Sequence, residues 1–508
     1  MANDECDYLV IGGGATGMAF SDTLLGNSRG LRVIVVDKHD APGGQWNDSY
    51  DFVRLHQPSA MYGVESKKLE AIAGDDERSS HRATRSEILE YYAGVRRDLE
   101  TNHDFEYFGG TTLDLAQLYD GNPSRQDYAI TDDKTGVSRT IRVRKRLVDA
   151  RNLEPDLPVS TPPKFGYPKD AVSVQPVNDI ATSDAAAEKK HFVVVGGGKT
   201  GMDAVYYLLT EKDVTPENIL WVVPNDAWIT ARENIGNCID LLYTSAKLHE
   251  DSSSSNDGNT DDEKKDTDAK ATTTPIGSDF FQRGFVEWEK QGHIYRLDSS
   301  IVPHKFKDAT LSREELGVLQ TVVPRMVRAG RISEITDTGS MVFKDGSTMD
   351  LPFASVADTL FLHCSAGAFH CTKSNKTPPP IFEEHRIVVQ DIYGTPGFCF
   401  VGSMLGKLES TSGLSDEERN QMCQTPRVSP AAPTEEVSGG DVIGSVSRDH
   451  PFVQRAHNLR MWMDRPELRR WVFESRLFHL GGADPDTVSE KVDYVFKVLK
   501  DNGIAMDN

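Results

Sequence analysis

The sequence predicts an α/β fold with two separate parallel sheets, and two features of the chain carry that prediction. A short apolar run at Leu9–Ile11 leads into a glycine-rich turn and then into a helical pattern over Met18–Leu25. The same order of strand, turn and helix returns in mid-chain, where Phe192–Val195 precedes Met202–Leu209. Strands that are apolar throughout are typical of parallel sheets, because helices cover both faces. Each repeat therefore predicts the first strand and helix of its own sheet.

The first glycine-rich turn has the spacing of a dinucleotide-binding site. Its three glycines permit a tight turn, a close approach of the backbone to a pyrophosphate, and close packing of helix on strand. A second apolar strand, Leu31–Val36, ends in an acid at the position where a ribose is bound in such sites. We expect this Rossmann-like unit to bind its cofactor through Gly12, Gly14, Ala15, Thr16, Gly17, Asp37 and Lys38.

The second glycine-rich turn predicts a second nucleotide site. Gly198-Lys199-Thr200 also matches the end of a phosphate loop, but Val193 stands where that motif requires its first glycine. Two dinucleotide turns in one chain are typical of a protein that holds FAD in one domain and NAD(P)H in another. The predicted residues of the second site are Gly196, Gly198, Lys199, Thr200 and Gly201, followed by Asn225 and Arg232 beyond the next strand.

A loop after the ribose acid is expected to run toward the reactive ring of the first cofactor. It contains Gly44, Gln45 and Trp46, and His56 and Gln57 follow it. Trp46, His56 and Gln57 are therefore the candidate catalytic residues. Taken alone, Trp46 is better explained as a core anchor and His56 as a hydrogen-bonded structural residue, so both interpretations stay open.

The order of these units predicts that one domain is inserted in the other. We expect the FAD-binding domain over 1–165 and again over 351–410, with the NAD(P)-binding domain over 185–350 between the two parts. Phe398–Val401 is predicted to be the last strand. Gly402 and a helix would follow it, and the helix N-terminus would favour negative charge on a reduced flavin.

The remaining segments are distinguished by composition. Prolines crowd residues 155–168 and predict an extended crossover between the domains. Residues 247–276 are rich in Ser, Asp and Lys and predict a disordered insertion, and residues 411–450 predict a mobile linker. Amphipathic patterns over 451–508 predict a C-terminal helical extension.

Composition excludes several classes of function. The 508 residues carry a formal net charge of −22, which opposes binding to nucleic acid or to an anionic membrane surface. No run is long and apolar enough to span a bilayer, and the first strand begins too early for a leader peptide, so we expect a cytoplasmic protein. The six cysteines form no CxxC pair, which predicts buried thiols and no dithiol chemistry. No metal site is predicted, and the oligomeric state is left open.

These motifs resemble the flavin-containing monooxygenase and pyridine nucleotide–disulfide reductase superfamily. The resemblance is carried by the paired glycine turns, by GGQWNDSYDFVRLHQPSAMYGV at 43–64, and by WVVPNDAWITAR at 221–232. It covers roughly residues 5–425. The chain departs from the family pattern at Ala150-Arg151-Asn152, where Ala-Thr-Gly is usual, and it lacks the His of the FxGxxxHxxxY signature.

The resemblance implies an oxidoreductase in which a nicotinamide reduces FAD, with monooxygenation of a small organic substrate as one outcome and another electron acceptor as the other. The alternative is a non-catalytic sensor that binds FAD or NAD(P)H. The family implies NADPH, but Asn225 and Asp226 stand where a cation would meet its 2′-phosphate, and Asp226 would repel that group. We therefore expect weak discrimination, with a slight preference for NADPH over NADH.

Overall fold

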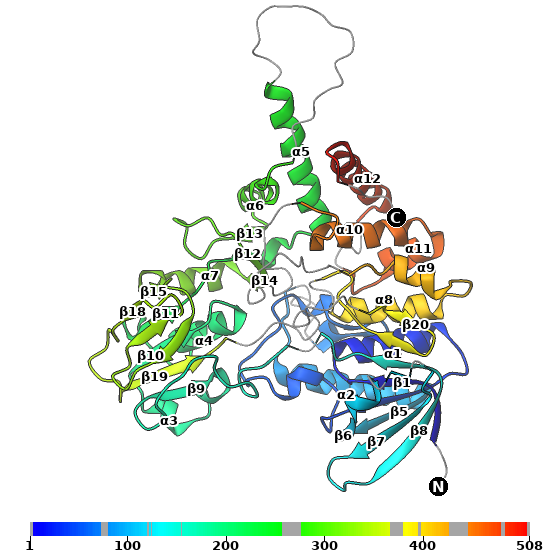
Figure 1. Ribbon diagram of the computed structural model, residues 1–508, viewed down its shortest axis with the longest axis horizontal. Coiled ribbons are helices and arrows are strands. Elements are labelled where there is room, and N and C mark those ends of the chain that lie inside the picture. Colours follow the sequence, from blue (N-terminus) through cyan, green and yellow to red (C-terminus); the bar gives the residue numbers. More distant parts are fainter. Residues whose placement is uncertain are drawn as a thin grey trace, which may run out of the picture.

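The computed structural model describes residues 4–72, 80–118, 121–122, 124–153, 155–256, 276–365, 379–394, 398–425, 446–478 and 483–504. It confirms the predicted α/β class: two parallel sheets, each with its own helices, lie on either side of the molecule in Figure 1. Within the described part of the chain, no helix combines the length and hydropathy that crossing a bilayer requires.

The first sheet has the strand order β20-β21-β8-β1-β2-β5. Its centre is parallel, with Leu9 of β1 beside Ile34 of β2 and Leu147 of β8, and a β6–β7 hairpin extends it beyond β8. Both faces of these strands are buried: one lies in a core with α1 and α2, and the other packs against apolar residues of β6, β7 and β8. The bounds are β1 Asp4–Ile11, α1 Ala15–Asn27, β2 Arg32–Asp37, α2 Arg85–Asn102, β5 Asp104–Gly109, β6 Thr111–Leu113, β7 Asp127–Asp132, β8 Ser138–Asp149, β20 Phe382–Glu383, β21 Arg386–Val388 and α8 Phe398–Ser410.

The second sheet is parallel throughout, with the order β15-β11-β10-β19-β9. It is inserted between β8 and β20 of the first sheet, which confirms the predicted nesting. Its elements are β9 Ser173–Pro176, α3 Asp184–Ala187, β10 His191–Val195, α4 Lys199–Thr210, β11 Ile219–Val222, α7 Arg313–Gln320, β15 Met326–Val327 and β19 Thr359–His363. A capping box between Ser312 and Glu315 opens α7.

The chain returns to the first sheet later than residue 351. β19 is fully buried and pairs with β10, so this strand belongs to the second sheet rather than to the returning segment. The sequence of an apolar strand does not indicate which sheet the strand joins. The return begins at β20 and is completed by β21, which pairs with β8.

The predicted strand at Phe398–Val401 is wrong. These residues form the first turn of α8, which continues to Ser410. Gly402 lies inside the helix, where a Cβ would overlap the carbonyl oxygen of Thr16 in α1, and a Cβ on Gly406 would lie 2.7 Å from the carbonyl oxygen of Phe20. The two glycines let the helices pack backbone to backbone. Gly402 thus packs α8 against α1, and its predicted place between a last strand and a helix N-terminus is not observed.

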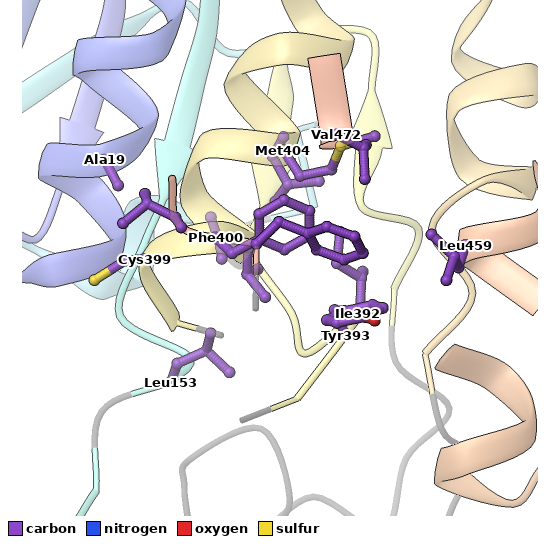
Figure 2. Packing of buried hydrophobic residues seen from close by; sticks show 14 of the residues in the cluster. Ala19, Leu153, Ile392, Tyr393, Cys399, Phe400, Met404, Leu459 and Val472 are labelled. Atoms are coloured by element: carbon purple, nitrogen blue, oxygen red, sulfur yellow. The ribbon is translucent and has the colours of Figure 1, made fainter. Parts of the chain in front are cut away.

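The C-terminal helices share a core with the first sheet. They are α10 Pro451–Met463, α11 Pro466–Glu474 and α12 Pro485–Asp501, and Pro466 is the first residue of α11. Figure 2 shows Phe400 and Met404 of α8 close to Tyr393 and to Val472 of α11. The ring of Phe400 lies 5.9 Å from that of Trp462 in α10. This region is therefore a packed part of the molecule.

The other elements connect the two sheets or cap them. The bounds are β3 Gly63–Val64, β4 Lys67–Lys68, β12 Trp228–Ala231, α5 Cys238–Asn256, α6 Phe280–Lys290, β13 Ile294–Tyr295, β14 Phe306–Leu311, β16 Ile332–Ile335, β17 Met341–Phe343, β18 Thr348–Met349 and α9 Asp416–Gln421. Two sequence predictions are corrected. α5 extends into the expected insertion, and α9, which begins with a capping box at Ser415, lies in the expected linker. The rest of both segments, 257–275 and 426–445, lies outside the described residues.

Candidate functional site

The first glycine turn joins β1 to α1 and leaves the N-terminus of that helix uncapped. Gly12 has a φ of +102°, and a Cβ on Gly17 would overlap the carbonyl oxygen of Gly12, so neither position accommodates a side chain. Gly14 is the N-cap of α1, with no side chain capping the helix and no acid in its first turn. The free N–H groups and the positive end of the helix dipole can thus attract an anion. Ala15 and Thr16 form the start of this turn of helix.

Asp37 lies at the end of β2, beside the glycine turn. One carboxylate oxygen accepts a 2.5 Å hydrogen bond from the Gly13 N–H, and the other accepts from the backbone and the Nδ1 of His39. These contacts hold the buried carboxylate at the edge of the sheet, and the adjacent Lys38 is exposed. His39 also contacts Asp48, and its hydrogen bond to Asp37 raises the pKa of the imidazole.

The loop at Gly43–Trp46 folds directly over this turn. The Gly43 N–H donates to the Gly13 carbonyl, and a Cβ on Gly44 would lie 2.8 Å from the Cα of Gly14. Trp46 is buried, and its Nε1 donates a 2.7 Å hydrogen bond to the hydroxyl of Tyr62. These contacts agree with the interpretation of Trp46 as a core anchor, and its part in binding a cofactor stays a prediction. Gln45 beside it is half-buried.

The second glycine turn repeats the first between β10 and α4. A Cβ on Gly201 would overlap the carbonyl oxygen of Gly196, and Gly198 is an uncapped N-cap with no acid in the first turn of its helix. Among the described residues, no atom lies within 4 Å of a Cβ built on Gly198, whereas Gly44 packs on Gly14 at the first turn. In the described part of the chain, the space beside the second helix N-terminus is therefore open.

Lys199 at this turn is held inside the protein. Its ammonium group pairs with Asp203 one turn along α4, and the hydroxyl of Tyr50 donates a 2.7 Å hydrogen bond to the same carboxylate. The ring of Phe52 stacks on Tyr207 of α4 with centroids 4.0 Å apart. The loop after the first site thus docks on the helix of the second. Lys199, predicted as a residue of the second site, is thus paired with Asp203 in the structure, and its part in binding a nucleotide stays a prediction.

A cluster of charged groups surrounds His56 at the junction of the two units. Arg232 donates through Nε to the carbonyl oxygen of His56 at 2.7 Å and pairs with Glu315 at 2.7 Å, and Glu315 also pairs with Arg82 at 3.0 Å. Burial, with the nearby cations Lys199, Arg232 and Arg82, holds the pKa of His56 well below its usual range. The imidazole is thus neutral at pH 7. Among the described residues it has no hydrogen-bond partner, and it remains a candidate catalytic group.

Arg232, one of the residues predicted for the second site, contacts groups at the junction of the two units. Its guanidinium is engaged by His56, Glu315 and the carbonyl oxygen of Thr310. The cation beside Asn225 is Arg328 instead, just after β15. It makes two hydrogen bonds to Asp226, at 2.8 and 3.2 Å, and a third to Asp298 at 2.9 Å. The expected repulsion by Asp226 is therefore offset by an arginine that sequence reasoning missed.

Gln57 lies in a pocket between the two units and the C-terminal helices. The wall contains polar groups from Thr230, Asn237, Cys238 and Tyr393, and apolar side chains from α5, α6 and β14. Phe452 and Arg455 of α10 complete it. The contribution of α10 to a pocket beside Gln57 was not predicted, because the amphipathic pattern of that helix shows only which face is buried.

The five described cysteines are free thiols, four of them buried. Cys371 lies outside the described residues. Within the described residues, no group of three His, Cys, Asp or Glu side chains is placed to hold a metal ion.

Comparison with known proteins identifies one family model and several relatives. The model of the NAD(P)-binding Rossmann-like domain matches residues 10–65 and confirms the first predicted unit. Uncharacterized proteins of Mycobacterium tuberculosis and Mycobacterium bovis are each 29% identical over 489 residues, which is 93% of this chain and 77% of theirs.

Solved structures with a similar arrangement include two monooxygenases. A flavin-containing monooxygenase from Stenotrophomonas maltophilia is 13% identical, with a TM-score of 0.44 over 80% of this chain and 97% of that chain. A cyclohexanone monooxygenase from Rhodococcus sp. Phi1, bound to NADP+, is 15% identical, with a TM-score of 0.45 over 98% of each chain. Because likeness at these scores carries no evidence of activity, only the chain's own residues bear on what it does.

Proposed function

We propose that the chain is a FAD-dependent oxidoreductase that takes hydride from NADPH or NADH and acts on a small organic molecule. One observation carries the proposal. Two glycine turns end parallel strands in nested sheets, and each places an uncapped helix N-terminus, without an acid in its first turn, at the edge of its sheet. Such ends favour a pyrophosphate.

The residues present fit the two cofactors. We assign FAD to the first sheet, where the N–H groups at Gly14–Gly17 would face its pyrophosphate and Asp37 would lie at the ribose. We assign the nicotinamide nucleotide to the second sheet, where the open space at Gly198 leaves room for the backbone to approach a pyrophosphate. Bound FAD supplies hydride acceptance and the onward transfer of electrons.

The chain's own contribution near the reactive ring would come from His56 and Gln57. A neutral imidazole donates or accepts a hydrogen bond without introducing charge, and Arg232, fixed on the His56 carbonyl, adds positive charge nearby. Positive charge at this position would favour a reduced, anionic ring. The buried contacts of Tyr50 and Phe52 with α4 would hold the two sites at a constant separation.

The test is a visible spectrum of the purified chain during anaerobic titration with NADPH and with NADH. The expected result is a yellow protein that bleaches with both nucleotides. A colourless protein, or bound flavin that neither nucleotide reduces, would contradict the proposal and favour a non-catalytic sensor. Readmission of air with a candidate substrate then separates monooxygenation from transfer to another acceptor. We also propose a cytoplasmic location, which the free thiols support.

A further inference from the structure

His39 links the predicted ribose acid to the loop that folds over the first glycine turn. Its Nδ1 lies 2.9 Å from Oδ1 of Asp37, and its Nε2 lies 2.8 Å from Oδ2 of Asp48. Asp48 follows directly after the short turn of helix Gly44–Asn47, and its backbone N–H donates to the carbonyl oxygen of Gln45. One imidazole therefore joins the end of β2 to the loop, with a carboxylate at each of its nitrogens.

Only the charged imidazole can satisfy both carboxylates. A carboxylate accepts hydrogen bonds and donates none, whereas a neutral imidazole carries a single N–H. With a proton on each nitrogen, the ring of His39 donates to Asp37 and to Asp48; after one proton is lost, one carboxylate faces a nitrogen lone pair. The hydrogen bond to Asp37 raises the pKa of His39, burial opposes this, and Asp48 raises the pKa further. The number of hydrogen bonds between the acid and the loop therefore changes when His39 loses its proton.

His39 also fixes the orientation of Asp37. Oδ1 of Asp37 accepts from the backbone N–H of His39 at 2.7 Å and from its Nδ1, and Oδ2 accepts a 2.5 Å hydrogen bond from the Gly13 N–H. A carboxylate has about four acceptor positions, so about one remains, and it is on Oδ2. The contacts with His39 thus leave the oxygen on the side of the glycine turn for a ribose hydroxyl.

The groups around this imidazole leave it as the one that changes charge. Among the described residues, the charged groups in contact with the ring are Asp37 and Asp48. Asp40, next in the chain, pairs instead with Lys134 in the turn between β7 and β8, and both side chains are exposed. Tyr107 of β5 stays neutral, because burial and the charge of Asp37 raise the pKa of its hydroxyl. A change at this contact in neutral to alkaline solution is therefore a change in the imidazole.

We propose that His39 is a positioning residue for Asp37, and that its protonation makes the first site hold FAD more tightly at pH 6 than at pH 9. The proton that leaves the ring goes to solvent, and the hydrogen bond to Asp37 or to Asp48 is lost with it. The acid or the loop is then held less firmly against the glycine turn, so the cofactor leaves faster. That the cofactor is FAD rests on the proposed function.

The experiment measures release of FAD from the purified full-length holoprotein at pH 6 and pH 9, as the flavin that passes an ultrafiltration membrane over time. Wild type is expected to release FAD about three to ten times faster at pH 9, the scale of one lost hydrogen bond to a charged group. His39→Gln should release FAD at the faster rate at both pH values, because an amide does not titrate. His103→Gln is the matched control. It removes a histidine at the C-cap of α2, where the side chain forms no ion pair with any described residue, and should keep the wild-type pH profile.

Asp48→Asn keeps the test decisive if His39→Gln fails to fold. A neutral imidazole can donate to Asp37 and accept from the amide introduced at position 48, so release should not become faster between pH 6 and pH 9. The inference alone would be overturned by pH-independent release from wild type, by the wild-type profile in folded His39→Gln, or by a rise in rate that Asp48→Asn retains. A chain that shows the expected release but is reduced by neither NADPH nor NADH would overturn the proposed function alone, and a chain that binds no FAD would overturn both.

Discussion

The two glycine turns share one geometry and have different surroundings. At each turn, a side chain at the third glycine would overlap the carbonyl oxygen of the first glycine, so the backbone of the two turns has the same close contact. Around the first, Gly44 packs on Gly14 and Asp37 is held by a backbone N–H and a histidine. Around the second, the space at Gly198 is open and Asp226 is held by Arg328. A covered site suits a resident cofactor and an open one suits a nucleotide that comes and goes.

The largest expected effect comes from breaking the feature that the turns share. Gly17→Ala places a methyl group on the Gly12 carbonyl oxygen, inside the closest contact between β1 and α1. Overpacking a backbone contact should lower the free energy of unfolding by about 3 kcal/mol or more. Chemical denaturation, monitored by circular dichroism, measures it.

The same helix offers the control. Gly26 lies in α1 with no atom within 4 Å of an added Cβ, so Gly26→Ala should stabilise the chain by about 0.5–1 kcal/mol through helix propensity. If both variants have the stability of wild type, the contact between Gly17 and Gly12 does not form.

The second effect distinguishes the covered turn from the open one. Gly14→Val should yield protein without flavin, because its side chain would stand between the helix N-terminus and the Gly44 loop. Gly198→Val should keep its flavin and its stability, because its side chain meets no other described residue. It should need much more NADPH for flavin reduction, because the same side chain would fill the space proposed for the nucleotide. The ratio of flavin absorbance to protein, and the rate of bleaching against nucleotide concentration, measure the two losses. Stoichiometric flavin in Gly14→Val would show that FAD binds elsewhere.

The sequence was sufficient for what depends on local spacing. Both glycine turns follow from residues a few positions apart, and so do the capping boxes that open α2 at Thr84 and α7 at Ser312. Phe398–Val401 was misread because a short apolar run does not distinguish a buried strand from a buried helix. The spacing of Gly402 and Gly406 was the available signal, since small residues one turn apart permit close helix packing.

The rest of the site depends on contacts between distant residues. Asp226 and Arg328 lie 102 positions apart, and although the sequence marks Asp226 as an acid at the second site, nothing near it in the chain indicates that Arg328 is its partner. Arg455 reaches its pocket only through the packing of α10 on α5 and on the segment before α8. No local sequence pattern indicates which distant residues will pair. For the same reason, the sequence did not predict that His56 would be neutral or that cations would surround it.

The third effect is a change in the preference for NADPH over NADH, which depends on the charges around Asp226 at the second site. Asn225→Arg should shift the preference toward NADPH by about 1–2 kcal/mol, the scale of a partly exposed charge-assisted contact. Arg328→Gln should shift it the other way, because Asp226 would then lose its cation and repel a 2′-phosphate. The ratio of flavin reduction rates with NADPH and NADH measures both. If wild type strongly prefers NADPH and neither substitution alters that preference, another residue recognises the 2′-phosphate.

The smallest effect is a pH dependence confined to the first site. The hydrogen bond to Asp37 raises the pKa of His39, whereas Arg328, whose pKa is raised by Asp226, stays charged throughout. A raised pKa in the folded state means that the stabilisation from His39 is complete below its unfolded value, near 6.5, and is lost as pH rises through the folded value.

The free energy of unfolding of wild type should therefore fall by about 1 kcal/mol more than that of His39→Gln between pH 6 and pH 9. Arg328→Gln should lower stability by the same amount at both pH values, because Asp226 raises the pKa of Arg328 and the guanidinium stays charged over that range. Denaturation curves of the three proteins at pH 6 and pH 9 test this, and parallel losses in wild type and His39→Gln would show that the contact between His39 and Asp37 contributes nothing that titrates.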